Sequence, residues 1–293
     1  MTLKQVVDVA GLRQALDSAR QQGRSVGVVP TMGALHEGHL SLVRQAKAQC
    51  DLAVATVFVN PTQFGPKEDF AQYPRNLERD MDLLATAQAD YVFTPSVQEM
   101  YPPLDQTRVR VAALTEGLCG ASRPGHFEGV TTVVSKFFNA IGPGTYFFGK
   151  KDYQQWRVIE RMASDLLFPV RVVGCPIVRE ADGLAMSSRN NYLSLEERAV
   201  APRLAAALLS AQARYRAGER NLAVLIDQTR RNLEGDIAEG PSFAIEYVEV
   251  RARSTLQTPE LDPQGRLAPG DGELVLLVAT RLGTTRLIDN VEL

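Results

Sequence analysis

Short apolar segments rich in β-branched residues alternate with amphipathic segments along the first 176 residues of this chain. A strand that is apolar on both sides has to be buried on both faces, and a parallel sheet covered by helices meets this requirement. The predicted strands are 25–30, 52–60, 90–95, 145–149 and 170–176, and the predicted helices are 38–50, 76–88, 129–141 and 152–166. The pattern predicts an α/β fold, a doubly wound parallel sheet of the Rossmann-like type with right-handed crossovers.

The pattern changes after about residue 177. Residues 194–219 have the periodicity of one long helix, and Ser194 followed by Glu197 has the spacing of a capping box. The later segments predict a helix at 221–238, strands at 243–252 and within 273–293, and an exposed loop at 261–272. Helices followed by strands indicate an α+β domain. We therefore expect two domains, residues 1–177 and a smaller one at residues 178–293.

Charge and composition argue against several classes of protein. A net charge of -2 gives no electrostatic reason to expect nucleic acid as a partner. No apolar run approaches the roughly 20 residues that span a bilayer, and the N-terminal segment lacks the apolar core of a secretory signal. Cys50, Cys119 and Cys175 are too widely spaced for a zinc site or a disulfide framework. We expect a cytoplasmic protein in which any metal is magnesium brought by a nucleotide.

The segment 28–43, VVPTMGALHEGHLSLV, contains two of the three histidines of the chain. It joins a predicted strand to a predicted helix, at the strand end where open α/β sheets bind ligands. Gly33 and Gly38 allow the backbone to approach a ligand closely, and the helix N-terminus offers free N–H groups. The spacing leaves two interpretations open: His36 and His39 cap the helix, or they face a phosphate group that acquires negative charge.

Further polar residues follow strands at the same edge of the predicted sheet. Gln63 follows the turn at Asn60, and its amide can donate and accept hydrogen bonds to a small polar substrate. Lys151 and Asp152 follow the strand 145–149 and can hold ATP, and Gln155 lies one helical turn further on. A solvent-exposed loop amide and an ordinary helix start are the alternative interpretations of these residues.

The segment 178–194 contains a predicted turn at Asp182 and Gly183, followed by Met186, Ser187, Ser188 and Arg189. Two hydroxyl groups and a guanidinium within three residues suit a phosphate-binding loop.

These motifs together resemble one family. The HxGH pattern of residues 36–39 is similar to the histidine pair of the nucleotidyltransferase superfamily, and the stretch matches neither GxxxxGK[ST] nor GxGxxG. Five segments then occur in order between residues 30 and 190: PTMGALHEGH, FVNPTQF, SRPGHFEGVTTVV, FGKKDYQQ and READGLAMSSRN. They resemble the pantothenate synthetase family, ligases that join pantoate to β-alanine.

The resemblance implies a two-step reaction. The carboxylate of pantoate attacks the α-phosphorus of ATP, which gives pantoyl adenylate and pyrophosphate. The amine of β-alanine then attacks the mixed anhydride and releases AMP and pantothenate. Because a carboxylate is a poor nucleophile that must approach an anionic phosphate, we expect positioning and charge stabilisation to carry most of the catalysis.

The resemblance also implies roles for individual residues. His39 would be the proton donor, with His36 and Lys151 as further catalytic residues; Gln63 would bind pantoate and β-alanine, and Gln155 would bind pantoate. The implied ATP-binding residues are Met32, Gly33, Ala34, Leu35, His36, Glu37, Gly38, His39, Gly149, Lys150, Lys151, Asp152, Val178, Met186, Ser187, Ser188 and Arg189. The resemblance does not decide whether Lys150 or Lys151 contacts the phosphates.

The resemblance extends to the metal and the assembly. Magnesium would accompany ATP, and Asp80 matches a ligand for it; the alternative is a carboxylate on a helix surface. The second domain would be a lid that excludes water from the adenylate. We expect a homodimer whose substrates are pantoate, β-alanine and ATP, with neither nucleic acid nor a membrane as partner. Arg123 and His126 would shape the site or a subunit contact.

Two other functions share part of this pattern. A nucleotidylyltransferase that transfers AMP to a phosphorylated acceptor has the same histidine pair, but it needs additional Arg or Lys where this chain has Gln63 and Gln155. A tRNA-charging relative would need a basic RNA-binding surface. A regulatory module that binds ATP without catalysis would release no pyrophosphate when pantoate is added.

Overall fold

A computed structural model describes residues 3–66, 68–235, 240–261 and 273–293. The chain divides into two compact units, Met1–Lys150 with Gln155–Pro176, and Lys151–Gln154 with Ile177–Leu293. The short segment Lys151–Gln154 belongs to the second unit, although the predicted domain boundary lies at residue 177.

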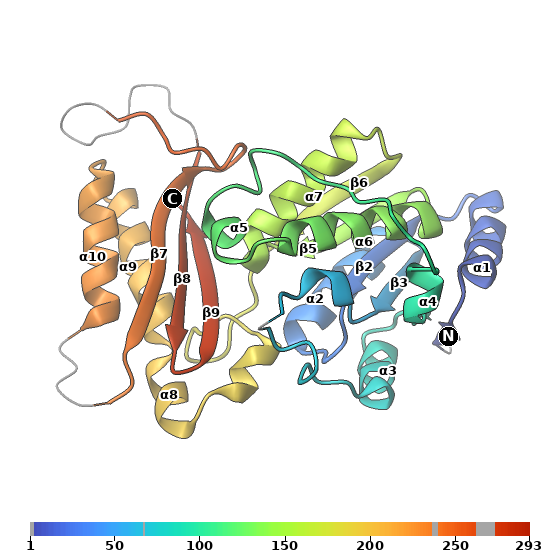
Figure 1. The fold of residues 1–293 in the computed structure, drawn as a ribbon, viewed down its shortest axis with the longest axis horizontal. Coiled ribbons are helices and arrows are strands. Elements are labelled where there is room, and N and C mark those ends of the chain that lie inside the picture. The colour runs from blue at the N-terminus through green and yellow to red at the C-terminus, as the bar shows by residue number, and fades with distance from the viewer. Residues whose placement is uncertain (1–2, 67, 236–239, 262–272) are drawn as a thin grey trace. The chain divides into compact units, whose positions relative to one another are not determined.

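The first unit contains a six-stranded parallel sheet with the strand order β1-β4-β3-β2-β5-β6. Figure 1 labels β2, β3, β5 and β6 of this sheet. The strands are β1 (Lys4–Val6), β2 (Val26–Thr31), β3 (Leu52–Val57), β4 (Tyr91–Phe93), β5 (Gly144–Gly149) and β6 (Val170–Cys175). The parallel, doubly wound sheet that the apolar segments predict is confirmed. The three-residue edge strand β1 was not predicted, because so short a segment shows no periodicity.

Helices follow most of these strands. They are α1 (Val9–Gln21), α2 (Glu37–Gln49), α3 (Leu77–Thr86), α4 (Val97–Met100), α5 (Leu118–Ser122), α6 (His126–Ile141) and α7 (Tyr153–Asp165), with the 3-10 helices η1 (Pro61–Gln63) and η2 (Lys150–Asp152). These helices lie in the connections between successive strands of the sheet. Because the strands are parallel, each connection has to cross a face of the sheet.

Successive residues of the strands point to opposite faces of the sheet, and each face has its own helices. Val92 of β4 packs in a buried cluster with Val43 of α2 and Leu84 of α3. The next residue, Phe93, contacts Phe137 of α6 edge-on, with ring centroids 6.4 Å apart. The strands are thus apolar on both sides because helices cover both faces, as the sequence pattern requires.

The second unit combines helices with a three-stranded antiparallel sheet in the order β7-β8-β9. Its elements are η3 (Ser188–Tyr192), α8 (Leu195–Val200), α9 (Arg203–Arg216), α10 (Leu222–Glu234), β7 (Phe243–Ala252), β8 (Leu274–Leu282) and β9 (Thr285–Glu292). Leu208 of α9, Leu225 of α10 and Leu276 of β8 are fully buried in one core cluster. The predicted α+β composition is confirmed for these residues.

The single helix predicted over residues 194–219 is wrong. The segment forms two helices, α8 and α9, which are separated at Ala201 and Pro202. Proline has no N–H group for the helical hydrogen bond, and its ring clashes with the carbonyl four residues earlier, so it ends one helix and begins the next. The predicted capping box is present, since Ser194 N donates to Glu197 Oε2 at 2.8 Å and Glu197 N donates to Ser194 Oγ at 3.1 Å.

The predicted loop at 261–272 lies outside the described residues, apart from Leu261.

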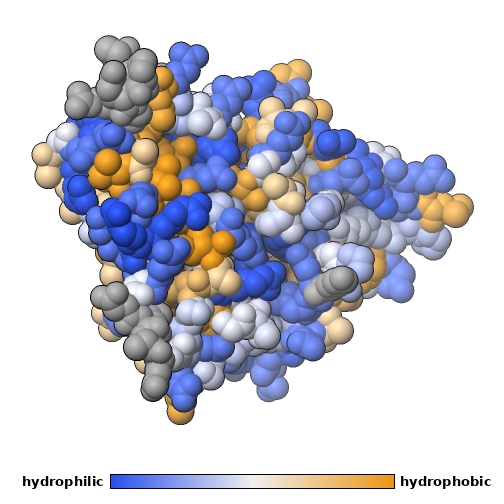
Figure 2. All heavy atoms as spheres, turned by 60° about the vertical axis from the view of Figure 1, so that its left-hand side comes forward, coloured by the Kyte–Doolittle hydropathy of each residue, from blue (hydrophilic) through white to orange (hydrophobic). Residues whose placement is uncertain are grey.

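Hydrophilic and hydrophobic residues are interspersed on the face of the molecule that Figure 2 presents. Within the described part of the chain, no helix is both long enough and apolar enough to cross a bilayer.

Gly174 on β6 has no room for a side chain. A Cβ atom there would lie 2.4 Å from Cε2 of the Trp156 indole, whose side chain is buried on α7. We expect Gly174→Ala to lower the free energy of unfolding by about 1–3 kcal/mol through overpacking. Urea unfolding measures this change. Gly65→Ala is the matched control, because a Cβ atom there meets only the Glu68 side chain at an ordinary 3.7 Å; equal stability of the two variants would contradict the prediction.

Candidate functional site

The strand order of the first unit reverses beside β2. From β2 the chain continues to β3 and β4 on one side of the sheet, and later to β5 and β6 on the other. Ligands of open α/β sheets bind beyond the carboxyl ends of the strands at such a point. The loop after β2 and the end of β5 at Gly149 therefore border the candidate site, and Gln63 lies in η1 after the neighbouring strand β3.

The loop after β2 has a constrained backbone. Gly33 has a φ angle of 82° and Ala34 a φ angle of 50°, both in the left-handed region. A Cβ atom on Gly33 would lie 2.8 Å from Asp80 Oδ2. The Asp80 side chain holds the loop in place, since Ala34 N donates to Asp80 Oδ2 at 3.0 Å and Leu35 N donates to Asp80 Oδ1 at 2.8 Å.

Asp80 is only 2% exposed, so the alternative of a carboxylate on a helix surface is wrong. Burial raises the pKa of Asp80, while the two N–H donors of the loop act in the opposite direction. Both carboxylate oxygens are thus engaged with backbone groups. Across residues 3–66, 68–235, 240–261 and 273–293, no group of three His, Cys, Asp or Glu side chains is arranged to hold a metal ion. Asp80, whose two oxygens both accept backbone N–H bonds, does not fit a dedicated magnesium site.

His36 and His39 do cap the helix. His36 is the N-cap of α2, and its Nδ1 atom accepts a hydrogen bond from Gly38 N at 3.1 Å. His36 N donates in turn to His39 Nδ1 at 3.4 Å, and the two rings lie with centroids 4.1 Å apart. The capping interpretation is therefore confirmed, and it has a chemical consequence. Because both Nδ1 atoms accept, a neutral ring carries its proton on Nε2, and Nε2–H is the group that can donate to an anion.

Gln63 is 8% exposed and is held through Asn60. Asn60 Nδ2 donates to Gln63 Oε1 at 3.1 Å and to the carbonyl oxygen of Gly129 at 3.1 Å. The Gln63 Nε2 atom lies 3.0 Å from the sulfur of Met32, which places it beside the loop after β2. The structure thus brings Gln63 and Met32, both predicted from sequence, to one place.

A second contact fixes the backbone of Gln63. His126 Nδ1 lies 2.9 Å from the Gln63 carbonyl oxygen, and Arg123 Nη1 lies 2.9 Å from His126 Nε2. A guanidinium can only donate, so His126 Nε2 accepts and Nδ1 donates to the carbonyl. Arg123 also forms a bidentate ion pair with Glu68, with both N–O distances 2.7 Å. Arg123 and His126 therefore hold the backbone of Gln63, and their expected role in shaping the site stays a prediction.

Lys150 contacts the indole of Trp156, with its Nζ atom 5.2 Å from the ring centroid. This is a cation–π distance, and it keeps Lys150 at the start of α7. Gln155 is half-buried in the first turn of the same helix.

The second unit holds Lys151 through the C-terminal strand. Asn290 of β9 donates from Nδ2 to the Lys151 carbonyl oxygen at 3.0 Å. The preceding residue, Asp289, is 1% exposed and forms a bidentate pair with Arg179, with N–O distances of 2.6 and 3.0 Å. Two neighbouring residues of β9 thus position both Lys151 and the beginning of the segment 178–189.

That segment forms a tight turn, as predicted. Gly183 has a φ angle of 93°, and Leu184 N donates to Asp182 Oδ1 at 3.1 Å. Ser187 caps η3 by accepting a hydrogen bond from Arg189 N at 3.3 Å. Val178 accepts a hydrogen bond from Met186 N at 3.0 Å, so both ends of the turn are joined. Val178, Met186, Ser187, Ser188 and Arg189 are therefore close neighbours within this unit.

A family model described as Pantoate-beta-alanine ligase matches residues 4–292. This chain belongs to the pantoate–β-alanine ligase family. Pantothenate synthetase of Moorella thermoacetica is 53% identical over 97% of this chain and 96% of the relative. That of Alcanivorax borkumensis is 48% identical over 97% and 96%. The chain is an enzyme, a ligase of pantothenate biosynthesis.

Solved structures agree with this family assignment. The crystal structure of pantothenate synthetase from Thermus thermophilus has a TM-score of 0.89 and 46% identity, with 99% of each chain covered. The pantoate–β-alanine ligase of Francisella tularensis, solved in complex with β-γ ATP and β-alanine, has a TM-score of 0.77 and 29% identity. It covers 99% of this chain and 97% of its own.

The sequence does not predict several residues that hold these segments within each unit. The sequence predicts only a turn at Asn60, and it predicts no role for Tyr101, Lys136, Asp289 or Asn290. The contacts of Asn60 with Tyr101 and of Arg179 with Asp289 join residues 41 and 110 positions apart. Local periodicity carries no signal for such pairs.

The Glu68–Arg123 pair predicts a pH dependence of stability in the ligase. Burial alone would raise the pKa of Glu68, but the hydrogen bonds and charge of Arg123 outweigh it and lower the pKa from 4.5 to about 2. A carboxylate with a lowered pKa in the folded state stabilises the fold above the unfolded pKa. This stabilisation is lost as the pH falls from about 4.5 to about 2.

Urea unfolding at pH 4.5, 3.5 and 2.5 tests this expectation. Glu68→Gln removes the titrating group, so stability of the variant should fall less steeply with decreasing pH than that of the wild type. Parallel pH profiles of the two proteins would refute a contribution from this pair.

Asp80 predicts a stability effect that needs no ligand. In Asp80→Asn one carboxylate oxygen is replaced by an NH2 group, which cannot accept the N–H bond of Ala34 or Leu35. We expect the free energy of unfolding to fall by about 1–3 kcal/mol in buffer with EDTA and no nucleotide. A variant that unfolds like the wild type under these conditions, and differs only when magnesium and ATP are added, would identify Asp80 as a metal ligand instead.

Proposed function

We propose that this ligase forms pantothenate through a pantoyl adenylate. The carboxylate oxygen of pantoate forms a bond with the α-phosphorus of ATP, and the bond to the bridging oxygen breaks to release pyrophosphate. The β-alanine amine then attacks the acyl carbon, and AMP leaves with the oxygen that linked the two. The observation that carries this proposal is the pair of histidines with Nδ1 acceptors at the strand-order reversal, on the N-terminus of α2.

His36 and His39 are proposed to bind the phosphates of ATP. Their Nδ1 atoms accept from backbone N–H groups, so neutral rings donate through Nε2–H. The dipole of α2 adds positive potential at the same end of the helix. Charge develops on the pyrophosphate oxygens as the bond to phosphorus breaks, and donors already in place stabilise it without reorganisation. His39 is the proposed proton donor to the leaving pyrophosphate.

Gln63 and Gln155 are proposed to bind pantoate, and Gln63 also β-alanine. The Gln63 oxygen is already engaged by Asn60, so the group that Gln63 offers to a substrate is its NH2 group, which lies beside Met32. An N–H donor can hold a carboxylate or hydroxyl oxygen of the acid without neutralising its nucleophilic charge.

Lys151, with Ser187, Ser188 and Arg189, is proposed to bind phosphate oxygens of ATP. Lys150 lies over the Trp156 ring, which favours Lys151 as the phosphate-binding lysine. Val178 and Met186 are proposed to contact the adenine side of ATP, and Met32 to Gly38, Gly149 and Asp152 to complete the nucleotide site.

Magnesium is proposed to arrive with ATP and to be held by phosphate oxygens and water, because Mg²⁺ commonly keeps several waters in nucleotide sites. Asp80 is proposed to hold the loop after β2 rather than to bind the metal. Magnesium would supply charge neutralisation between the phosphates, and the protein residues position the reacting groups.

We further propose that the second unit is a lid that protects the adenylate from water, and that the enzyme is a cytoplasmic homodimer. The adenylate is a reactive mixed anhydride, so excluding water from it prevents wasteful hydrolysis.

Pyrophosphate release from ATP tests the proposed reaction. With pantoate and no β-alanine, we expect about one equivalent of pyrophosphate per site, and turnover to AMP and pantothenate when β-alanine is added. ATP binding without pantoate-dependent release would overturn the adenylate route, and would favour a regulatory nucleotide-binding module.

His39 is the residue on which this reaction should depend most. We expect His39→Ala to fold and to lose adenylation by roughly 100-fold or more, because it loses a preorganised donor. His39→Gln is the matched control, since glutamine at this position of a helix can accept the N–H bond of the N-cap residue. Both variants should be equally inactive in the pyrophosphate assay, although His39→Gln should be the more stable. Recovery of activity in His39→Gln would return His39 to a capping role alone.

A further inference from the structure

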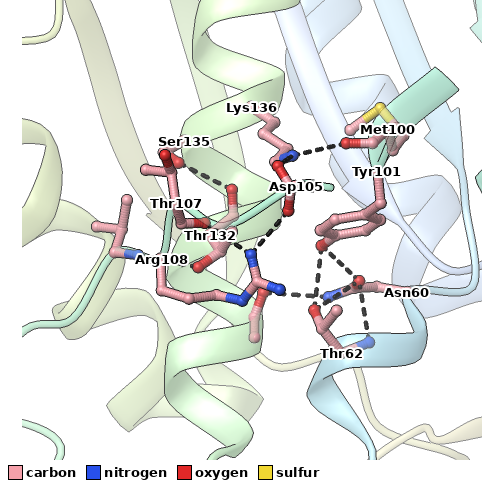
Figure 3. Close-up of polar contacts among 12 residues, drawn as sticks. Asn60, Thr62, Met100, Tyr101, Asp105, Thr107, Arg108, Thr132, Ser135 and Lys136 are labelled. Carbon is pink, nitrogen blue, oxygen red and sulfur yellow. Dashed lines mark hydrogen bonds and ion pairs between the residues drawn. The ribbon is translucent and has the colours of Figure 1, made fainter. Parts of the chain in front are cut away.

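Asn60 links Gln63 to a buried hydrogen-bond network of side chains that have no role in the proposed reaction. Asn60 is 1% exposed, and its side-chain oxygen accepts hydrogen bonds from Tyr101 Oη at 2.7 Å and from Thr62 Oγ1 at 3.0 Å. The two hydroxyl groups also lie 3.1 Å apart. Figure 3 shows Asn60, Thr62 and Tyr101 converging at this point.

The orientation of the Asn60 amide follows from its backbone partners. The Gly129 carbonyl can only accept, so it requires the NH2 group of Asn60, and the Thr62 N–H can only donate, so it requires the oxygen. In this orientation the second N–H of Asn60 points at Gln63 Oε1. The amide of Gln63 is thereby fixed with its own NH2 group directed away from Asn60, toward the side where Met32 lies.

Tyr101 is held in turn by Lys136 of α6. The Lys136 Nζ atom lies 4.4 Å from the centroid of the Tyr101 ring, and it donates to the Met100 carbonyl oxygen at 2.7 Å and to Asp105 Oδ1 at 2.8 Å. Arg108 donates to the other oxygen of Asp105 at 2.7 Å. Figure 3 shows Lys136 above the tyrosine ring with Asp105 beside it. The cation therefore restrains both the ring and the backbone that precedes it.

Tyr101 suits the role of a hydrogen-bond donor in this network. Burial raises the pKa of its phenol, so the hydroxyl stays protonated across the physiological range.

Lys136 and Gly129 lie on the same helix, and a Cβ atom on Gly129 would lie 2.3 Å from the Thr62 carbonyl oxygen. Helix α6, which carries both residues, thus contacts η1 directly.

We propose that Tyr101, held by Lys136, is a positioning residue for the acid substrate. Its hydroxyl adds a donor to the oxygen of Asn60 and so restrains this side chain in the orientation that the Gly129 carbonyl and the Thr62 N–H select. Gln63 then presents N–H donors and not its carbonyl oxygen to the oxygens of pantoate. This inference rests on the proposed role of Gln63 in binding pantoate. A Gln63 amide free to rotate would spend part of its time with a carbonyl oxygen facing a carboxylate, which is repulsive.

Steady-state kinetics of the full-length Tyr101→Phe variant test the proposal. We expect KM for pantoate to rise about threefold to tenfold, as for the loss of one buried hydrogen bond, with little change in kcat or in KM for ATP. Tyr146→Phe is the matched control, because the Tyr146 hydroxyl donates to the Gly142 carbonyl at 3.0 Å in the buried core. It should lose stability but keep all three KM values. An unchanged KM for pantoate in Tyr101→Phe would overturn the proposal.

A double-mutant cycle with Gln63→Ala separates this inference from the function on which it rests. If Tyr101 acts through Gln63, Tyr101→Phe should raise KM for pantoate in the wild type but have no further effect in Gln63→Ala. An equal effect in both backgrounds would overturn the positioning role alone. A wild-type KM for pantoate in Gln63→Ala would overturn the proposed role of Gln63 itself.

Lys136→Met provides a second variant should Tyr101→Phe fail to fold. It removes the cation from the ring and keeps most of the side-chain volume, and Asp105 retains its bond to Arg108. We expect a rise of about twofold to fivefold in KM for pantoate, with KM for ATP unchanged. A change in both KM values would indicate a general structural role and would refute the proposal.

Discussion

Strand β2 pairs in parallel with β3 on one side and with β5 on the other, and the rest of the site depends on this pairing. It brings the loop after β2, the turn after β3 and the end of β5 to one edge of the sheet. The carboxyl ends of parallel strands meet at the same edge, so residues from three distant segments become neighbours. The N-terminus of α2 then adds its free N–H groups at the point where the strand order reverses.

Buried polar side chains hold the loops that this pairing assembles. Asp80 accepts two backbone N–H bonds, and Asn60 joins Gln63 to Tyr101. Burying such groups costs free energy unless their hydrogen bonds are made, so each is stable only in one geometry. The same requirement makes the geometry specific: a loop that moved would leave a buried carboxylate or amide without its partners. Rigid positioning of the reacting groups follows from the cost of displacing them.

His36 and His39 show why two interpretations of a motif need not exclude each other. The capping box occupies the Nδ1 atoms of both rings, so the donor of each neutral ring is its Nε2–H group. The structural role therefore sets the tautomer on which the proposed chemical role depends. Capping residues at the N-terminus of a helix are commonly serine or aspartate. Histidine caps through Nδ1 here, and its second ring nitrogen is then available for the proposed chemical role.

The sequence by itself determined the parallel sheet, the α+β second unit and the family, because apolar periodicity and short motifs are local properties of the chain. It failed where one residue outweighs a periodic pattern, as at Pro202, and where an element such as β1 is too short to show a period. Only the tertiary structure decided that Asp80 is buried against the loop after β2 and that Tyr101 reaches Asn60. Both contacts join residues more than 40 positions apart. The physical reason is that a buried polar side chain is satisfied by whichever group the fold places beside it, and periodicity does not identify that group.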